Sequence, residues 1–229
     1  MRKASSVVYN IDNEVKTMKP YDQMTMTKLE KTREALLKKH FAASVVGNCL
    51  EARELVRSLI GEGQSVCFGG SMTLQESGIL DMVYGMNVKI YDRYKEGLSR
   101  EDANLLYRQS FMADVLLTSS NAVTMTGELY NIDGTGNRVA AMIFGPDKVI
   151  CVVGRNKVVT DEEAAVDRVR NVAAPANCIR LHKDNPCTKI GRCADCNSDT
   201  RICDAFVALK RCHEPGRIHV ILVNEDLGY

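Results

Sequence analysis

The sequence predicts an α/β protein with an open, mostly parallel sheet that carries helices on both faces, and with a small antiparallel excursion. Short apolar segments alternate along the chain with amphipathic segments of helical period, separated by turns rich in Gly, Ser or Asn. The 229 residues are 45% hydrophobic, which suffices for one full hydrophobic core. We therefore expect one domain rather than several.

Residues 1–24 are polar and lack a clear period, so we expect an N-terminal arm there and a single domain over residues 25–229. A first helix is expected from Thr25, and a second from Asn48, a favourable N-cap, to Gly61. Strand and helix signals then alternate, which is typical of a parallel sheet. The expected elements are a strand at 65–68, a helix from about 73, a strand at 88–91, a helix at 99–111 and a strand at 113–117.

Residues 121–153 predict the antiparallel excursion, because short strand signals are separated there by tight turns. The strands expected from this point onward are 122–126, 129–133, 139–144, 149–153, 178–181 and 217–224. Thr160, with Glu163 three residues later, forms a capping box for a helix that runs to about Asn171.

The charge balance disfavours two classes of function. Lys and Arg number 30 against 29 Asp and Glu, so the net charge is +1, whereas nucleic-acid and membrane-surface binders carry a basic excess. No apolar run approaches the roughly 18 residues that span a bilayer. The N-terminal residues also lack the apolar core of a signal peptide. We expect a cytoplasmic protein that binds neither nucleic acid nor membranes.

Cysteine is over-represented, with nine residues, and the thiols of a cytoplasmic protein are kept reduced. Six of the nine lie within residues 178–212. We call residues 187–212, which hold five of these six, the Cys-rich segment. Four thiols with a central Cys-x2-Cys pair predict a metal site, and the spacing fits either zinc or an iron–sulfur cluster. The predicted ligands are Cys187, Cys193, Cys196 and Cys203. The alternative is a set of reduced structural thiols.

A Gly-rich turn follows the strand expected at 65–68. Gly69 and Gly70 bring backbone N–H groups close to a ligand, and the helix that begins at Ser71 or Thr73 attracts anions. In open α/β sheets this edge is where ligands bind, so these four residues are predicted to bind a phosphate or carboxylate. The alternative is an ordinary strand-to-helix turn, capped by Thr73 with Glu76 completing a capping box.

Polar side chains also follow the strand expected at 113–117. Ser119, Asn121 and Asn131 are predicted to bind the ligand from the opposite wall of the site. Glu128 and Asp133 are the predicted catalytic residues, since carboxylates carry out general acid–base work. The alternative is that these residues serve turns and decorate strands.

Three strings of the sequence are specific when taken together. They are VCFGGSMTLQESGI, LLTSSNAVTMTGELYNIDGTGNRVAAMIFGPDKVICVVGRNKVV and RIHVILVNEDLGY. Through them the chain resembles the lactate-utilisation (LUD) domain family over roughly residues 25–229. The resemblance implies a fold similar to that of ribose-5-phosphate isomerase, glucosamine-6-phosphate deaminase and the CoA transferases. In that fold, ligands lie at strand C-termini near a Gly-rich loop, which residues 69–73 match.

Members of this family are associated with the oxidation of L-lactate to pyruvate beside iron–sulfur protein subunits. The resemblance thus implies a component of 2-hydroxy acid (lactate) utilisation or related redox metabolism, such as an oxidoreductase subunit. The partners that the resemblance implies are a small anionic metabolite and iron–sulfur protein subunits. Assembly of the chain into a homo-oligomer is an open alternative. The chain also resembles a short stand-alone branch with the tail PCTKIGRCADCNSDTRIC. The alternative is a non-enzymatic metabolite-binding or interaction module with a structural metal site.

Overall fold

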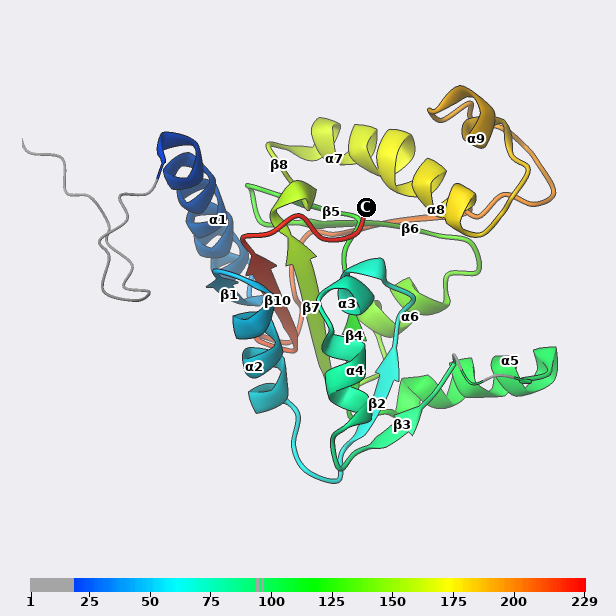
Figure 1. The fold of residues 1–229 in the computed structure, drawn as a ribbon, viewed down its shortest axis with the longest axis horizontal. Helices are drawn as coiled ribbons and strands as arrows, with labels where there is room; N and C mark the ends of the chain where they lie inside the picture. Colours follow the sequence, from blue (N-terminus) through cyan, green and yellow to red (C-terminus); the bar gives the residue numbers. More distant parts are fainter. Residues whose placement is uncertain (1–18, 94, 96) are drawn as a thin grey trace, which may run out of the picture.

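The computed structural model describes residues 19–229 except residues 94 and 96. Its central feature is a sheet of six strands: β1 (Ala42–Val46), β2 (Ser65–Phe68), β3 (Lys89–Tyr91), β4 (Val115–Thr118), β7 (Lys148–Gly154) and β10 (Ile218–Val223). The strand order is β1-β10-β7-β4-β2-β3, and every neighbouring pair is parallel (Figure 1). The predicted α/β class with a mostly parallel sheet is confirmed.

A second, smaller sheet contains the predicted antiparallel excursion only over residues 122–133, because the strand expected at 149–153 is β7 and lies in the main parallel sheet. It contains β5 (Ala122–Thr124), β6 (Leu129–Asp133), β8 (Val158–Val159) and β9 (Ala205–Leu209). Strand β6 pairs antiparallel with β5 and with β9, whereas β8 joins β5 in parallel. Strand β9 had no counterpart in the sequence prediction, and neither had β1.

Helices cover both faces of the main sheet (Figure 1). They are α1 (Pro20–Lys38), α2 (Cys49–Leu59), α3 (Met72–Glu76), α4 (Ile79–Tyr84), α5 (Arg100–Gln109), α6 (Asn137–Ile143), α7 (Glu162–Arg168), α8 (Ala174–Arg180) and α9 (Pro186–Ile190). Short 3-10 turns occupy Ser110–Met112 and Arg155–Lys157, and a π-helical turn, Val169–Ala173, joins α7 to α8. No helix of the described residues is both long and apolar enough to cross a bilayer.

Successive residues of β7 face two different hydrophobic cores. Ile150 and Val152 pack with residues of α2, α3 and α4, and Cys151 and Val153 pack with residues of α1, α6 and the second sheet. A central parallel strand is buried on both faces, which explains the continuous apolar run in its sequence. A third cluster joins the second sheet to α7 on its far side.

Two segments predicted as strands are helical. Residues 139–144 belong largely to α6, and residues 178–181 continue the helical stretch of α7 through the π-helical turn into α8. Both predictions were wrong because a short apolar run does not distinguish a buried strand from a buried helix turn. Helix α1 begins at Pro20, so residues 20–24 belong to it, and residues 1–18 of the predicted arm lie outside the described part of the chain.

The predicted helix caps hold in part. The side chains of Asn48 and Ser99 each accept a hydrogen bond from the backbone N–H three residues on, at 3.0 Å and 3.1 Å. Asp161 rather than Thr160 caps α7, with its carboxylate 2.9 Å from the N–H of Ala164. The carboxylate is the stronger acceptor for the exposed N–H groups of a helix start.

Candidate functional site

The parallel strands β2 and β4 end beside a cavity of about 280 Å³. Of the residues predicted from sequence, those that line this cavity are Gly70, Ser71, Ser119, Asn121 and Asp133. They come from the turn after β2, the turn after β4 and the end of β6. The expected meeting of these segments at one edge of the sheet is therefore found.

The Gly-rich turn after β2 forms part of the cavity wall. Ser71, not Thr73, caps α3, with its hydroxyl accepting a hydrogen bond from the N–H of Leu74 (3.3 Å). At Gly69, a Cβ atom would lie 2.7 Å from Oγ1 of Thr118 and 2.9 Å from Cγ of Arg138. Only glycine therefore permits Arg138 to lie against this turn.

Arg138 forms hydrogen bonds to most of the polar residues that were predicted for the opposite wall of the site. Its guanidinium is buried and pairs with Oδ1 of Asp133 at 2.6 Å. It also donates to Oδ1 of Asn131 (2.8 Å), to Oδ1 of Asn121 (3.0 Å) and to the carbonyl oxygen of Ser119 (2.8 Å). Asn131 is fully buried behind it and does not reach the cavity. Arg138 was not among the predicted site residues; it lies just before residues 139–144, which were predicted as a strand but belong largely to α6.

Lys157 is a second site residue that the sequence analysis missed. It follows β7, its side chain is 3% exposed, and its Nζ donates to Oγ1 of Thr73 (2.7 Å) and to Oγ of Ser119 (3.2 Å). No acidic side chain of the described residues forms an ion pair with it. Burial, together with the positive charges of Arg168 and Arg138, lowers the pKa of Lys157 to about 7.

The last residues of the chain close over Lys157 and Thr73. The hydroxyl of Thr73 donates to the carbonyl oxygen of Leu227 (3.2 Å), and the N–H of Gly228 donates to the carboxylate of Glu76 (2.6 Å). A Cβ atom on Gly228 would lie 2.8 Å from Oγ1 of Thr73. Glu76 therefore fixes the C-terminal segment rather than completing a capping box.

The cavity is positively charged overall. Its four basic lining side chains are Arg93, Arg138, Lys157 and Arg180, and its one acidic lining side chain is Asp133. Because Asp133 is already paired with Arg138, the remaining charge is positive. Such a cavity attracts an anion.

Glu128, the other predicted catalytic residue, lies elsewhere. It stands before β6 and Asp133 ends it, a separation of about 16 Å at the rise of a strand. Its carboxylate pairs with Lys39 (2.7 Å) and Lys210 (3.3 Å) and accepts from the hydroxyl of Tyr130 (3.0 Å). Burial alone would raise the pKa of Glu128, but these hydrogen bonds hold it below its ordinary value. The structure therefore does not bring the two carboxylates together.

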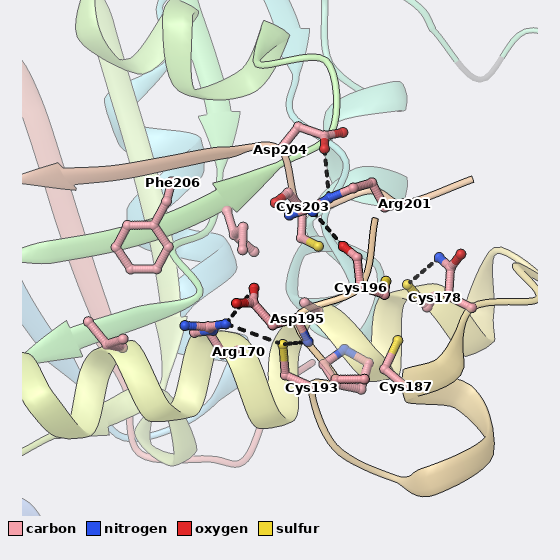
Figure 2. Close-up of a pocket in the computed structure, with 16 residues that line it drawn as sticks. Arg170, Cys178, Cys187, Cys193, Asp195, Cys196, Arg201, Cys203, Asp204 and Phe206 are labelled. Atoms are coloured by element: carbon pink, nitrogen blue, oxygen red, sulfur yellow. Dashed lines mark hydrogen bonds and ion pairs between the residues drawn. The ribbon is translucent and has the colours of Figure 1, made fainter. Parts of the chain in front are cut away.

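The cysteine-rich segment forms a second cavity, of about 350 Å³, which we call the thiol pocket. Five cysteines line it: Cys178, Cys187, Cys193, Cys196 and Cys203. Figure 2 shows them around one common space, to which α8, α9 and the loop that follows α9 all contribute. Cys178 is the member that the sequence analysis did not include. No three His, Cys, Asp or Glu side chains in the described part of the chain are arranged to hold a single metal ion.

The thiol pocket and the cationic cavity share one wall. Ile132 lines both cavities. Consecutive residues face opposite sides of this wall, namely Asn177 and Cys178 on α8, and Ile202 and Cys203 in the loop. The N–H of Asp204 donates to the carbonyl oxygen of Asp133 (2.9 Å), and a Cβ on Gly134 would lie 3.3 Å from Cα of Ile202. The cysteine-rich loop thus packs directly on the rim of the cationic cavity.

These features define an α/β domain with a cavity at the C-terminal ends of its parallel strands. The sequence model of the LUD domain matches residues 29–223, and the chain belongs to the LUD domain family. A crystal structure of a DUF162 family protein from Deinococcus radiodurans is similar in fold, with a TM-score of 0.51 and 18% sequence identity. The similarity covers 87% of this chain and 98% of that one. Among curated proteins, none matches this sequence.

Proposed function

We propose that the chain binds a small anionic metabolite, a 2-hydroxy acid or a phosphorylated compound, in the cationic cavity. The family relates the chain to lactate utilisation in general terms. The observation that supports the finer proposal is the charge of the cavity, where four basic side chains meet one carboxylate that is already paired. In this role the protein is a component of 2-hydroxy acid utilisation or related redox metabolism.

In this proposal, different residues around the cavity bind the anion, position the binding residues and transfer a proton. The hydroxyl of Ser71 and the backbone of the turn at Gly70 line the cavity and offer hydrogen bonds to an anionic group. Arg138 is held in place by Asp133, so in this proposal the carboxylate of Asp133 positions Arg138 and does not transfer a proton. Lys157 takes that role, because an amine with a pKa of about 7 exchanges a proton readily near neutral pH.

Calorimetric titration tests the proposal with defined probes. We expect the protein to bind L-lactate, pyruvate or inorganic phosphate, and to bind the neutral amide lactamide at least about tenfold more weakly, since a charge-assisted hydrogen bond contributes roughly 1.5–3 kcal/mol. Equal binding of lactate and lactamide, or no binding of any of the three anions, would contradict it.

Two substitutions at one glycine supply a matched pair. A Cβ atom at Gly70 would have its nearest neighbour, Nη1 of Arg93, at 3.6 Å, which is an ordinary contact. Gly70→Ala should therefore retain the affinity for the anion, whereas Gly70→Asp places a negative charge on the cavity wall and should weaken it at least about tenfold. An unchanged affinity in Gly70→Asp would show that the anion binds elsewhere.

A further inference from the structure

We propose that the thiol pocket binds an iron–sulfur cluster of the four-iron type rather than a single zinc ion. The ligands are Cys187, Cys193, Cys196 and Cys203, and the thiol of Cys178 is a hydrogen-bonding neighbour of Cys187. The charge of the cationic cavity plays no part in this argument, so the proposal is independent of the metabolite.

The first observation is the size of the space that the cysteines surround. In a zinc site, four sulfurs about 2.3 Å from the ion lie about 3.8 Å from one another. The cysteines here instead surround a space of about 350 Å³, and no three of them among the described residues are arranged around a single ion. A cluster places iron and sulfide between its cysteine ligands and so requires a wider arrangement. The pocket fits the cluster better than the ion.

The second observation is the local structure around Cys193. The backbone N–H of Asp195 donates to Sγ of Cys193 (3.4 Å), and Asp195 adopts a left-handed conformation with φ 48°. The N–H of Cys193 itself donates to Oδ1 of Asn171 (3.0 Å). Hydrogen bonds to cysteine sulfur stabilise a bound cluster and tune its potential. The Cys-x2-Cys turn is therefore already folded in the form that a ligand pair needs.

The third observation concerns two arginines that line the pocket. A four-iron cluster with four thiolate ligands carries a net negative charge. Arg170 lies within hydrogen-bonding distance of Sγ of Cys193 (3.8 Å), as Figure 2 shows. Arg201 donates to the carbonyl oxygens of Cys196 (2.6 Å) and Cys203 (3.0 Å), which holds both residues at the pocket. Each guanidinium is also paired with a carboxylate of the pocket, Arg170 with Asp195 (2.7 Å) and Arg201 with Asp204 (2.8 Å), so the two arginines support a cluster through their hydrogen bonds to the cysteines and not through an excess of positive charge.

The fourth observation is that the cysteine-rich loop is anchored to the domain. Asn185 is 1% exposed, and its amide donates to Sγ of Cys178 (3.4 Å) and to the carbonyl oxygen of Thr200 (3.2 Å). Its Oδ1 accepts from the hydroxyl of Thr200 (2.7 Å). This buried link fastens the loop to α8, so the ligands are held in place before a cluster binds.

Anaerobic reconstitution of the full chain with ferrous iron and sulfide tests the proposal. We expect about four iron and about four sulfide per chain, with visible charge-transfer absorption. Cys193→Ser and Cys196→Ser should lose this absorption. Cys49→Ser is the matched control, because Cys49 lies outside the pocket and its Sγ donates to the carboxylate of Glu225 (2.7 Å), a bond that serine can also make.

Cys178→Ala separates the two roles within the pocket. We expect this variant to keep its full iron content, with the midpoint potential of the cluster lowered by loss of a hydrogen bond to sulfur. Far-UV circular dichroism of every variant shows whether a loss of iron is a loss of fold. Loss of iron in folded Cys178→Ala, or a colourless protein that takes one zinc and no iron, would overturn the proposal. Failure to take up any metal would overturn it as well.

Discussion

Replacing Lys157 by methionine should make the protein more stable at pH 7 while removing its proposed acid–base group. The amine is buried, and its pKa is lowered from 10.5 to about 7 by that burial. At pH 7 the unfolded chain is therefore charged at this position, whereas the folded protein is about half neutral. Folding has to release part of a proton, which disfavours the native state.

The size of this effect follows from the two pKa values, at about 1.36 kcal/mol per pH unit. The lowered pKa of Lys157 reduces the free energy of unfolding by about 4 kcal/mol at pH 7 and by about 2 kcal/mol at pH 9, where the unfolded chain begins to lose the same proton. Methionine removes this cost but also deletes the hydrogen bonds to Thr73 and Ser119, about 1 kcal/mol each. We expect Lys157→Met to be about 2 kcal/mol more stable than the natural protein at pH 7 and about equal to it at pH 9.

Urea unfolding under reducing conditions, followed by circular dichroism at both pH values, measures this difference. Other groups that titrate between pH 7 and pH 9 contribute equally to both proteins and cancel. Lys89→Met, which removes a positive charge from an exposed position, controls for the change in net charge. A difference in unfolding free energy between Lys157→Met and the natural protein that is the same at both pH values would refute the reasoning.

Three further predictions follow from the site. The affinity for L-lactate should fall by about 25-fold from pH 6.5 to pH 8.5 as Lys157 loses its charge, and calorimetry on Lys157→Met should show no such fall. Gly69→Ala should lower the unfolding free energy by about 1–3 kcal/mol, because its methyl group would lie 2.7 Å from Oγ1 of Thr118; a urea midpoint equal to that of the natural protein would contradict this. Glu128→Gln should lower the unfolding free energy by about 1 kcal/mol through loss of its pairing with Lys39, and leave lactate affinity unchanged; weaker lactate binding would return Glu128 to the binding site.

The parts of the site that follow directly from strand ends could be predicted from sequence. Ser119 and Asn121 come just after β4, and Gly70 and Ser71 just after β2, so the parallel order alone places them at one edge. Lys157 follows the equally apolar strand β7 and satisfies the same rule. It was missed because a single lysine in a turn carries no motif.

Other features depend on tertiary contacts that no local pattern reports. Arg138 reaches the cavity from the first turn of α6. The apolar run of this helix is equally typical of a strand, so the sequence does not predict that position. Cys178 joins the thiol pocket because α7 continues through a π-helical turn into α8. Glu128 and Asp133 look equivalent in sequence, yet they lie at opposite ends of β6.

The wall between the two cavities connects the two proposed binding sites. The cysteine-rich loop bonds to Asp133 through Asp204, and Asp133 in turn holds Arg138. Any ligand that orders this loop therefore acts on the rim at Asp133 and Gly134, where the metabolite is proposed to bind. Linkage is reciprocal. If a group in the thiol pocket changes the affinity for the metabolite by some factor, the metabolite changes the affinity for that group by the same factor.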